Sequence, residues 1–257
     1  MMAASKPKVA FFDFTSCEGC QLSAVDSLQD YPDLLDAIEI VQFREAMSEK
    51  SDDYQIAFVE GACVRPADEK RLQAIREQAA IVIAFGACAH LGGVTTIRNW
   101  QPLDKVRGYV YGEMGKRFEV DSARPISAVI NVDGFIPGCP IDREEFIRAV
   151  KALLQGRLPS IPDYPVCVEC RLRENVCVFL HGKACLGSIT RAGCQAICPT
   201  YGLGCLGCRG QISQSNPNGL KWALNAHGYD AKKFDEQMRL FLSYQVLESK
   251  VDSNVEK

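Results

Sequence analysis

Short apolar runs alternate with amphipathic stretches over the first 160 residues of the chain. Five runs rich in β-branched and aromatic side chains have the length of strands, at 8–14, 39–43, 55–59, 81–85 and 128–132. The stretches between them are predicted to be helical. Strands that alternate with helices form a mostly parallel sheet covered on both faces, so the pattern predicts a doubly wound, flavodoxin-like α/β domain.

Two of the predicted helices have clear start signals. Pro66 occupies a first helical position, and Asp68 follows in the first turn, where acidic side chains are favoured. A second helix is predicted to open at Asp142, with Glu145 three residues later as in a capping box. Gly156 is its predicted stop, because glycine readily ends a helix.

The pattern changes after residue 160. Residues 157–165 are rich in proline, which breaks both helices and central strands, so we expect one domain over 1–160 and another over 161–257. Residues 166–210 contain eight cysteines and seven glycines without a sustained period. This mostly irregular segment is not expected to fold by hydrophobic burial alone. A C-terminal helix is predicted to begin at a cap on Asp230 and to run to about residue 250.

Charge and composition narrow the range of partners. The chain has 29 Lys and Arg against 32 Asp and Glu, a net charge of -3, so a nucleic-acid partner is not expected. The longest apolar run, 79–89, is too short to cross a bilayer. The first residues show neither a secretory apolar core nor twin arginines, so we expect a cytoplasmic protein without a membrane span.

Cysteine is the unusual part of the composition. The chain has 13 cysteines, an odd number that cannot pair completely. Stable disulfides are disfavoured in a reducing cytosol. So many thiols in a chain of this kind therefore indicate metal binding.

The first five cysteines follow predicted strands. Cys17 and Cys20 come after the first strand, Cys63 after the third, Cys88 after the fourth and Cys139 after the fifth. In an open parallel sheet, ligands bind outside the carboxyl ends of the strands. Four thiolates from three of these loops could therefore hold one metal centre. Any single one of them, taken alone, is more typical of a small buried side chain.

The other eight cysteines divide into two groups of four. The groups are Cys167, Cys170, Cys177 and Cys185, followed by Cys194, Cys198, Cys205 and Cys208. Two tetrahedral four-thiolate sites fit this count, and zinc is one alternative because CxxC pairs also build zinc ribbons. The run Cys194-x3-Cys198-Pro199 matches the end of a bacterial ferredoxin motif. Together with the count of thiolates, this favours iron–sulfur clusters.

Several motifs together resemble a known family. They are CEGC at 17–20, VEG at 59–61, GACAHLGG at 86–93, IPGCP at 136–140, GKACLG at 182–187, RAGC at 191–194 and CLGC at 205–208. Over most of residues 8–210 the chain resembles the small, electron-transfer subunit of [NiFe]-hydrogenases. Within that family it is most similar to the cytoplasmic sulfhydrogenase delta-type and coenzyme-F420-type branch.

The resemblance implies three [4Fe-4S] clusters. The implied ligands are Cys17, Cys20, Cys88 and Cys139 for a proximal cluster, Cys194, Cys198, Cys205 and Cys208 for a medial one, and Cys167, Cys170, Cys177 and Cys185 for a distal one. Respiratory members differ, because a histidine replaces Cys167 and their three-iron medial cluster lacks the ligand at Cys198. The partition of the late cysteines stays open, since the cysteine before proline ligates the other cluster in two-cluster ferredoxins.

The resemblance also implies a function. H2 would be oxidised or evolved at a nickel–iron site on a separate large subunit, and this chain would pass electrons to a further flavin or iron–sulfur subunit. The chain would thus be a hydrogenase subunit without the catalytic site. Two alternatives are a multi-cluster electron-transfer subunit without hydrogenase activity and a zinc-stapled interaction protein. No G-x-G-x-x-G loop follows a strand, so the chain itself is not expected to bind a dinucleotide.

A few residues remain outside this assignment. Cys63 is either a buried inert thiol or a fifth thiolate that assists the proximal cluster during oxidation. Glu18 lies between two proximal cysteines and could carry protons or act as a solvated or interface carboxylate. His90, His181 and His227 are not assigned as ligands, because the thiolates already suffice.

Overall fold

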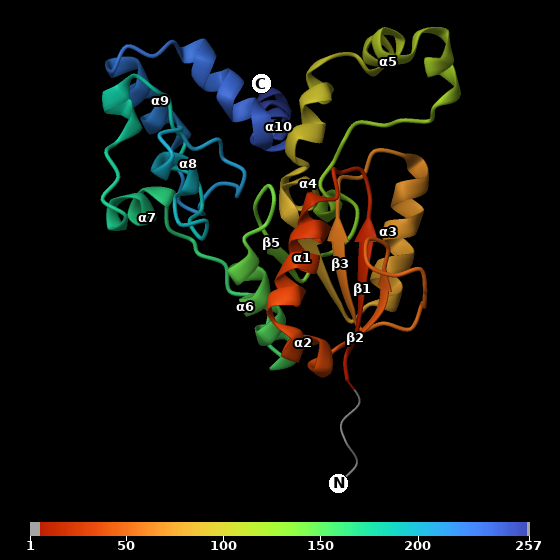
Figure 1. Cartoon of the computed structure of the whole chain (residues 1–257). Helices are drawn as coiled ribbons and strands as arrows, with labels where there is room; N and C mark the ends of the chain where they lie inside the picture. The colour runs from red at the N-terminus through yellow and green to blue at the C-terminus, as the bar shows by residue number, and fades with distance from the viewer. Residues whose placement is uncertain (1–5, 256–257) are drawn as a thin grey trace. The chain divides into compact units, whose positions relative to one another are not determined.

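The computed structural model describes residues 6–255, and the chain divides into two compact units, Met1–Ser160 and Ile161–Lys257 (Figure 1). The first unit contains a five-stranded sheet whose neighbouring strands are all parallel. Its strands are β1 (Lys8–Asp13), β2 (Glu39–Phe43), β3 (Ile56–Glu60), β4 (Ile81–Phe85) and β5 (Gly134–Ile136). The order β2-β1-β3-β4-β5 is that of a flavodoxin-like fold, as predicted.

Helices cover both faces of the sheet. One face carries α1 (Gly19–Asp30), α2 (Pro32–Ala37) and α6 (Arg143–Leu154), and the other carries α3 (Pro66–Gln78). Alternate residues of each strand serve the two faces: Phe11 packs in the α1 and α6 layer, and Phe12 packs in the α3 layer. The predicted doubly wound architecture is confirmed.

An aromatic cluster fixes the sheet against α6. Phe11 stacks on Phe43 and Phe58, with ring centroids 4.1 and 4.9 Å apart. Phe146 of α6 packs across Phe58 and Phe85 at 5.8 and 5.6 Å. All five rings are fully buried, and each contributes on the order of 1.5–3 kcal/mol by leaving water. The strand ends, and the loops that follow them, therefore have a rigid base.

The predicted fifth strand is wrong. Residues 128–132 are not a strand; a 3-10 turn, Ile126–Ala128, begins after Pro125, and the edge strand comes later as β5. Ile126 and Ile130 are buried in the layer under α3, so this apolar run covers a sheet face instead of extending the sheet edge. Periodicity in so short a run does not separate these two outcomes.

The predicted helix boundaries are confirmed. Helix α3 begins at Pro66, and α6 begins after Asp142, whose Oδ1 accepts the backbone N–H of Glu145 at 2.8 Å. Helix α6 ends at Leu154, and Gly156 follows with a φ of +70°. Both helices start where a side chain or a proline compensates for the unpaired N–H groups of a first turn.

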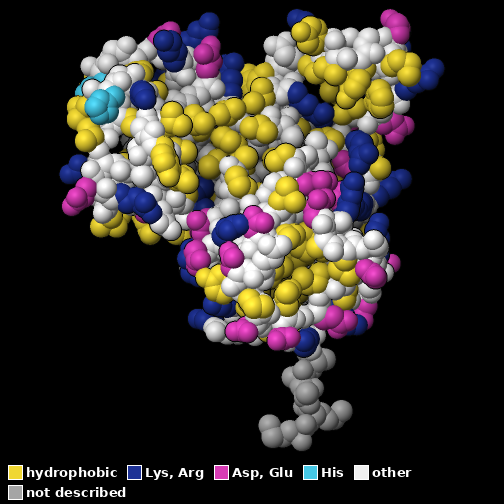
Figure 2. Space-filling model, viewed as in Figure 1, with side chains coloured by type: hydrophobic (Ala, Val, Ile, Leu, Met, Phe, Trp, Pro, Cys, Tyr) yellow, Lys and Arg dark blue, Asp and Glu magenta, His cyan; other side chains and the backbone are white. Residues whose placement is uncertain are grey.

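A long connection within the first unit joins β4 to β5. It contains α4 (Gly86–Leu91), a 3-10 turn (Gly93–Trp100), α5 (Leu103–Tyr111) and a second 3-10 turn (Gly112–Arg117). Large apolar side chains lie exposed along it, and Figure 2 shows them as yellow atoms at the upper right; they include Tyr109, Val110, Tyr111, Met114 and Phe118. Reciprocal hydrogen bonds between Asn99 and Ala123, at 2.8 and 2.9 Å, close its base.

The second unit is largely irregular. Its helices are α7 (Val166–Leu172), α8 (Ile197–Thr200), α9 (Pro217–Ala226) and α10 (Ala231–Val255), with a 3-10 turn at Val178–His181. One core cluster joins Val166, Ala196 and Cys205 to the partly buried Cys170, Cys185 and Cys194. Ordinary apolar side chains of this unit are buried as well, among them Leu186, Ile189, Leu220 and Leu224. The expectation that residues 166–210 need a bound group to fold stays a prediction.

Two helices end the chain. Helix α10 is confirmed, because Asp230 Oδ1 accepts the backbone N–H of Lys232 at 2.9 Å and the helix follows directly. It is kinked at Leu242, whose backbone is not helical. Helix α9 was not predicted, although Asn216 caps it just before a proline. No helix within the described residues is both long and apolar enough to cross a membrane.

Candidate metal centres

Cys17, Cys20, Cys88 and Cys139 lie at the carboxyl edge of the sheet. Cys17 and Cys20 flank the start of α1 after β1, Cys88 lies in α4 directly after β4, and Cys139 lies in the loop after β5. Cys20 is buried, whereas Cys17 and Cys139 are exposed, so this group reaches the surface of the unit. Three loops that are distant in sequence thus place their thiols at one edge, as parallel strands allow.

The thiols of this group act on one another electrostatically. Burial raises the pKa of Cys88 to about 12, and the charges of Cys139 and Cys17 add to the effect. Desolvation by neighbouring atoms also raises the pKa of Cys139, with a further contribution from Cys17. The pKa of Cys20 is raised by burial first and then by Glu60, with smaller contributions from Cys88 and Cys139. Such influence requires that the four thiols share one small region.

This chemistry fits a cationic metal group. Desolvation and repulsion disfavour bare thiolates at Cys20, Cys88 and Cys139, and a bound metal removes that cost by displacing the protons. The local backbone also leaves room for such a group. Gly86 has a φ of +83° and a Cβ there would overlap Cys20 Sγ, while a Cβ on Gly93 would lie 3.2 Å from Cys88 Sγ. Only glycine combines such φ values with so close an approach to sulfur.

The buried Glu60 stabilises the start of α1 at this edge of the sheet. Its carboxylate, 2% exposed, accepts the backbone N–H of Cys20 at 3.2 Å and that of Gln21 at 3.1 Å. It therefore caps α1, whose N-cap residue Glu18 has a left-handed φ of +62° and turns its side chain toward Arg44. Burial raises the pKa of Glu60, and the two backbone hydrogen bonds oppose that rise. Glu60 belongs to the VEG motif, but no role was predicted for it; the available signal was an acidic residue at the end of a central strand.

Replacing Glu60 with glutamine is expected to lower the free energy of unfolding by about 1–3 kcal/mol, because one of two buried N–H donors would face an amide nitrogen. Chemical denaturation measures this loss. Glu77→Gln, on the exposed side of α3, is the matched control and should change stability by less than about 0.5 kcal/mol. Equal stability of the two variants would show that Glu60 is not the cap.

Cys63 lies in different surroundings. It is completely buried in the apolar layer under α3, together with Leu72. Burial raises the pKa of its thiol, and the guanidinium of Arg124, with Nη2 3.9 Å from Sγ, opposes the rise. The backbones of Cys63 and Arg124 pair as well. These contacts are those of a core side chain, and a role for Cys63 during oxidation stays a prediction.

Glu18 lies at the surface among other charged groups. Its Oε1 lies 3.8 Å from Arg44, which also binds Asp13 at 2.9 Å. Partial desolvation raises the pKa of Glu18, and its hydrogen bond with Glu45 adds to the rise. This arrangement accommodates either of the two roles considered for the carboxylate.

The second unit brings four of its cysteines together. Cys167 and Cys170 lie on α7, and Cys177 and Cys185 lie on either side of the 3-10 turn Val178–His181. Burial raises the pKa of Cys167 to about 11, with further contributions from Cys185, Cys170 and Cys177. The pKa of Cys185 is likewise raised by burial, while backbone hydrogen bonds to its sulfur oppose the rise.

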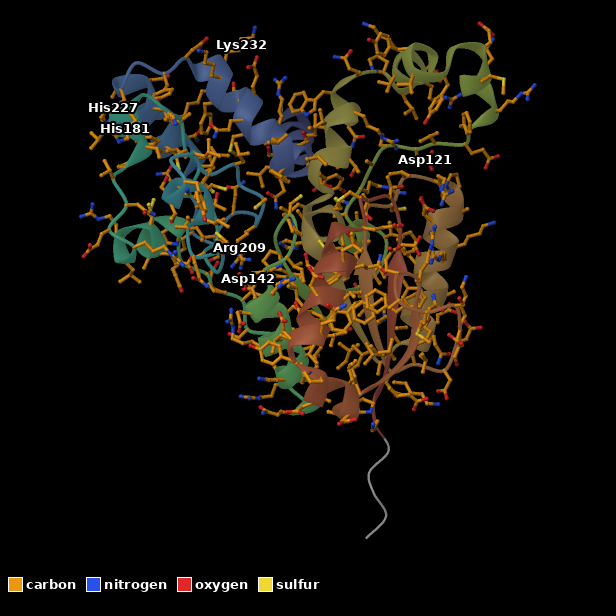
Figure 3. The ribbon with its side chains drawn as sticks, viewed as in Figure 1. Asp121, Asp142, His181, Arg209, His227 and Lys232 are labelled. Carbon is orange, nitrogen blue, oxygen red and sulfur yellow. The ribbon has the colours of Figure 1, made fainter. Side chains whose placement is uncertain are left out.

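The remaining group is more deeply buried. Cys205 is 6% exposed, and its pKa is raised mainly by burial, with Cys185 and Cys208 among the smaller causes. Cys194 precedes two residues with left-handed φ, and the guanidinium of Arg209 opposes the burial that raises its pKa. Arg209 (labelled in Figure 3) is itself 1% exposed and donates from Nε to Ala192 O at 2.8 Å. A buried cation here suits an anionic neighbour.

The two groups of the second unit adjoin. The backbone N–H of Cys205 donates to Cys185 Sγ at 3.1 Å, and that of Gly187 donates to the same sulfur at 3.4 Å. Among the described residues, 6–255, no three His, Cys, Asp or Glu side chains are arranged to hold a single metal ion. A four-iron cluster is larger than one ion and takes one thiolate on each iron, so its ligands stand further apart.

Comparisons with known proteins identify the family. Residues 17–153 match the family of the NADH ubiquinone oxidoreductase 20 Kd subunit. Sulfhydrogenase 2 subunit delta of Pyrococcus furiosus is 37% identical over 216 residues, covering 83% of this chain and 90% of that protein. A subunit of the vhu F420-non-reducing hydrogenase of Methanococcus voltae is 31% identical, covering 93% of this chain and 94% of the relative.

A solved structure agrees with these relatives. The crystal structure of an NAD+-reducing [NiFe]-hydrogenase in the H2-reduced state contains a chain that is 25% identical, with a TM-score of 0.56. The match covers 62% of this chain and 96% of that one. The motifs, the fold and these relatives lead to one conclusion: the chain belongs to the 20 Kd subunit family as a [NiFe]-hydrogenase small subunit of the sulfhydrogenase delta and F420-type branch, an oxidoreductase subunit of a hydrogenase complex.

Proposed function

We propose that this chain relays electrons, one at a time, between a nickel–iron site on a large subunit and a further flavin or iron–sulfur subunit. The reaction served is H2 ⇌ 2H+ + 2e-, in either direction, in the cytoplasm. The observation that carries the proposal is the gathering of four thiols at the carboxyl edge of the sheet, together with eight more in the second unit. Iron–sulfur clusters supply reversible one-electron chemistry when they are bound by such thiolates.

We assign three [4Fe-4S] clusters to these thiols. The proposed ligands are Cys17, Cys20, Cys88 and Cys139 for the proximal cluster, Cys194, Cys198, Cys205 and Cys208 for the medial cluster, and Cys167, Cys170, Cys177 and Cys185 for the distal cluster. The influence of Cys185, Cys170 and Cys177 on the pKa of Cys167 supports the distal set. The contact between Cys205 and Cys185 supports neighbouring medial and distal clusters.

The chain's own groups would hold and tune these clusters. The exposed Cys17 and Cys139 would keep the proximal cluster within reach of the large subunit. Backbone N–H groups that donate to sulfur, such as those on Cys185, would stabilise the more negative, reduced form. Glu60 would keep the start of α1, and with it Cys20, in place.

Anaerobic purification of the native complex tests the proposal. We expect a brown complex with about twelve irons and about twelve acid-labile sulfides per copy of this chain, after subtraction of the iron held by the other subunits. A nickel-containing large subunit should co-purify. A content of about three zinc ions per chain and no sulfide would contradict the proposal and indicate a zinc-stapled protein. Full iron without a nickel partner would indicate an electron-transfer subunit of another redox complex.

The Cys63→Ser variant is expected to keep the full iron content and H2-dependent dye reduction within about twofold of the native complex, because Cys63 packs in the core and not among the grouped thiols. Its electron paramagnetic resonance spectrum before and after exposure to oxygen should also match the native one. A changed proximal signal after oxygen exposure would instead establish Cys63 as a fifth thiolate.

A further inference from the structure

Asn175 connects the two cysteine groups of the second unit. It lies in the turn between α7 and Cys177, where its backbone N–H donates to Cys170 O at 3.1 Å. Its side-chain Nδ2 lies 3.7 Å from Cys170 Sγ and 3.0 Å from Thr200 Oγ1. Thr200 ends α8, the helix that also carries Cys198. One amide therefore bridges a sulfur of the proposed distal group and the helix of the proposed medial group.

The surrounding hydrogen bonds determine which end of the amide faces the sulfur. The single hydroxyl hydrogen of Thr200 is donated to Ala196 O at 3.0 Å, so Thr200 Oγ1 acts as an acceptor toward Asn175. A flipped amide would place Oδ1 against that acceptor and against the sulfur of Cys170. In the structure the NH2 group faces both, with one N–H for the hydroxyl and the other for Sγ.

We propose that Asn175 is a positioning residue that raises the reduction potential of the distal cluster by donating to Cys170 Sγ. This inference rests on the proposed function, because it requires that Cys170 ligates a cluster. Reduction adds negative charge that the thiolate sulfurs share, and an N–H donor stabilises that charge more in the reduced form than in the oxidised form. Thr200 holds the donor in place, so its hydroxyl contributes indirectly.

Redox titration of the intact complex, followed by electron paramagnetic resonance, tests this role. The distal signal is identified as the one lost in Cys177→Ala. Asn175→Leu should shift the distal midpoint potential to a more negative value and leave the medial and proximal potentials unchanged. Asn175→Asp should shift it further in the same direction, because it replaces a donor with a negative charge. Thr200→Ser keeps the hydroxyl and should retain the native potential.

The outcomes separate this inference from the proposed function. A native distal potential in Asn175→Leu and Asn175→Asp, with full iron content, would overturn the inference and leave the relay intact. If those variants fail to assemble the distal cluster, Thr200→Val is used instead, because it keeps Asn175 but removes the hydroxyl that holds its amide. A more negative distal midpoint potential than in Thr200→Ser would support the inference. Equal potentials in the two variants would overturn it. A native complex without three cluster signals would refute the proposed function itself.

Discussion

Replacing Cys139 with alanine is expected to lower H2-dependent dye reduction by more than about a hundredfold. Removing a residue that only hydrogen-bonds to a metal ligand already lowers metal affinity or activity about 10–100-fold. Cys139 is itself a proposed ligand, so its loss should have a larger effect. It is also the one cysteine that the loop after β5 contributes to the group at the sheet edge. The measurement is hydrogen-dependent reduction of a viologen dye by the purified complex, together with its iron content.

Position along the relay should decide how each cluster variant behaves. Cys139→Ala would interrupt the proposed path at its entry, so transfer to every acceptor should fall. Cys170→Ala, at the distal group, should retain much of the dye reduction, because a small dye can also be reduced further upstream. Transfer to the natural acceptor should fall strongly in the same variant. Equal retention of both activities in the two variants would contradict the proposed order.

Cys63→Ser is the matched control for Cys139→Ala. Both remove a thiol that follows a strand of the same sheet, but Cys63 lies in the apolar layer under α3, away from the edge group. If Cys63→Ser lost activity as completely as Cys139→Ala, general destabilisation would explain both results. Native iron content in Cys139→Ala would also exclude its proposed role as a ligand.

Much of the fold was predictable because its signals are local. Strands β2 and β4 have the predicted bounds, since β-branched and aromatic residues fill much of each run. Helices α3 and α6 begin at Pro66 and after Asp142, because a proline or a capping side chain at the helix start marks the boundary in the local sequence. The edge strand β5 was missed, because its three residues pair only through contacts with β4.

Topology predicted that cysteines gather at the sheet edge, but not which of them do. Parallel strands end at the same edge, so thiols that follow β1, β4 and β5 are expected near one another. Cys63 follows β3 and would be expected there as well, but it packs in the layer under α3. The supporting contacts were not predictable in this way. Glu60 meets the amide of Cys20 across 40 residues, and Asn175 meets Thr200 across 25. Such pairs depend on how loops cross, and a single sequence holds no periodic signal for them.

The Gly86→Ala variant is expected to lose the proximal cluster. Gly86 has a φ of +83°, and an added Cβ would overlap Cys20 Sγ and lie 3.6 Å from Gly138 O. The backbone has little freedom to retreat, because the N–H of Ala87 donates to Gly138 O at 2.7 Å. A free thiol could rotate away from the new methyl group, but a thiolate held by a cluster could not. The steric clash therefore weakens binding of the cluster.

The matched control for this variant is Gly228→Ala. Gly228 has a φ of +81°, nearly the same as that of Gly86, but a Cβ there would meet no atom within 4 Å in the described structure. Both variants carry the backbone strain of a left-handed alanine, about 1–2 kcal/mol. Only Gly86→Ala should also lose about four irons per chain and more than about 99% of H2-dependent dye reduction. If both variants kept full iron and equal activity, Cys20 would not be held by a cluster beside Gly86.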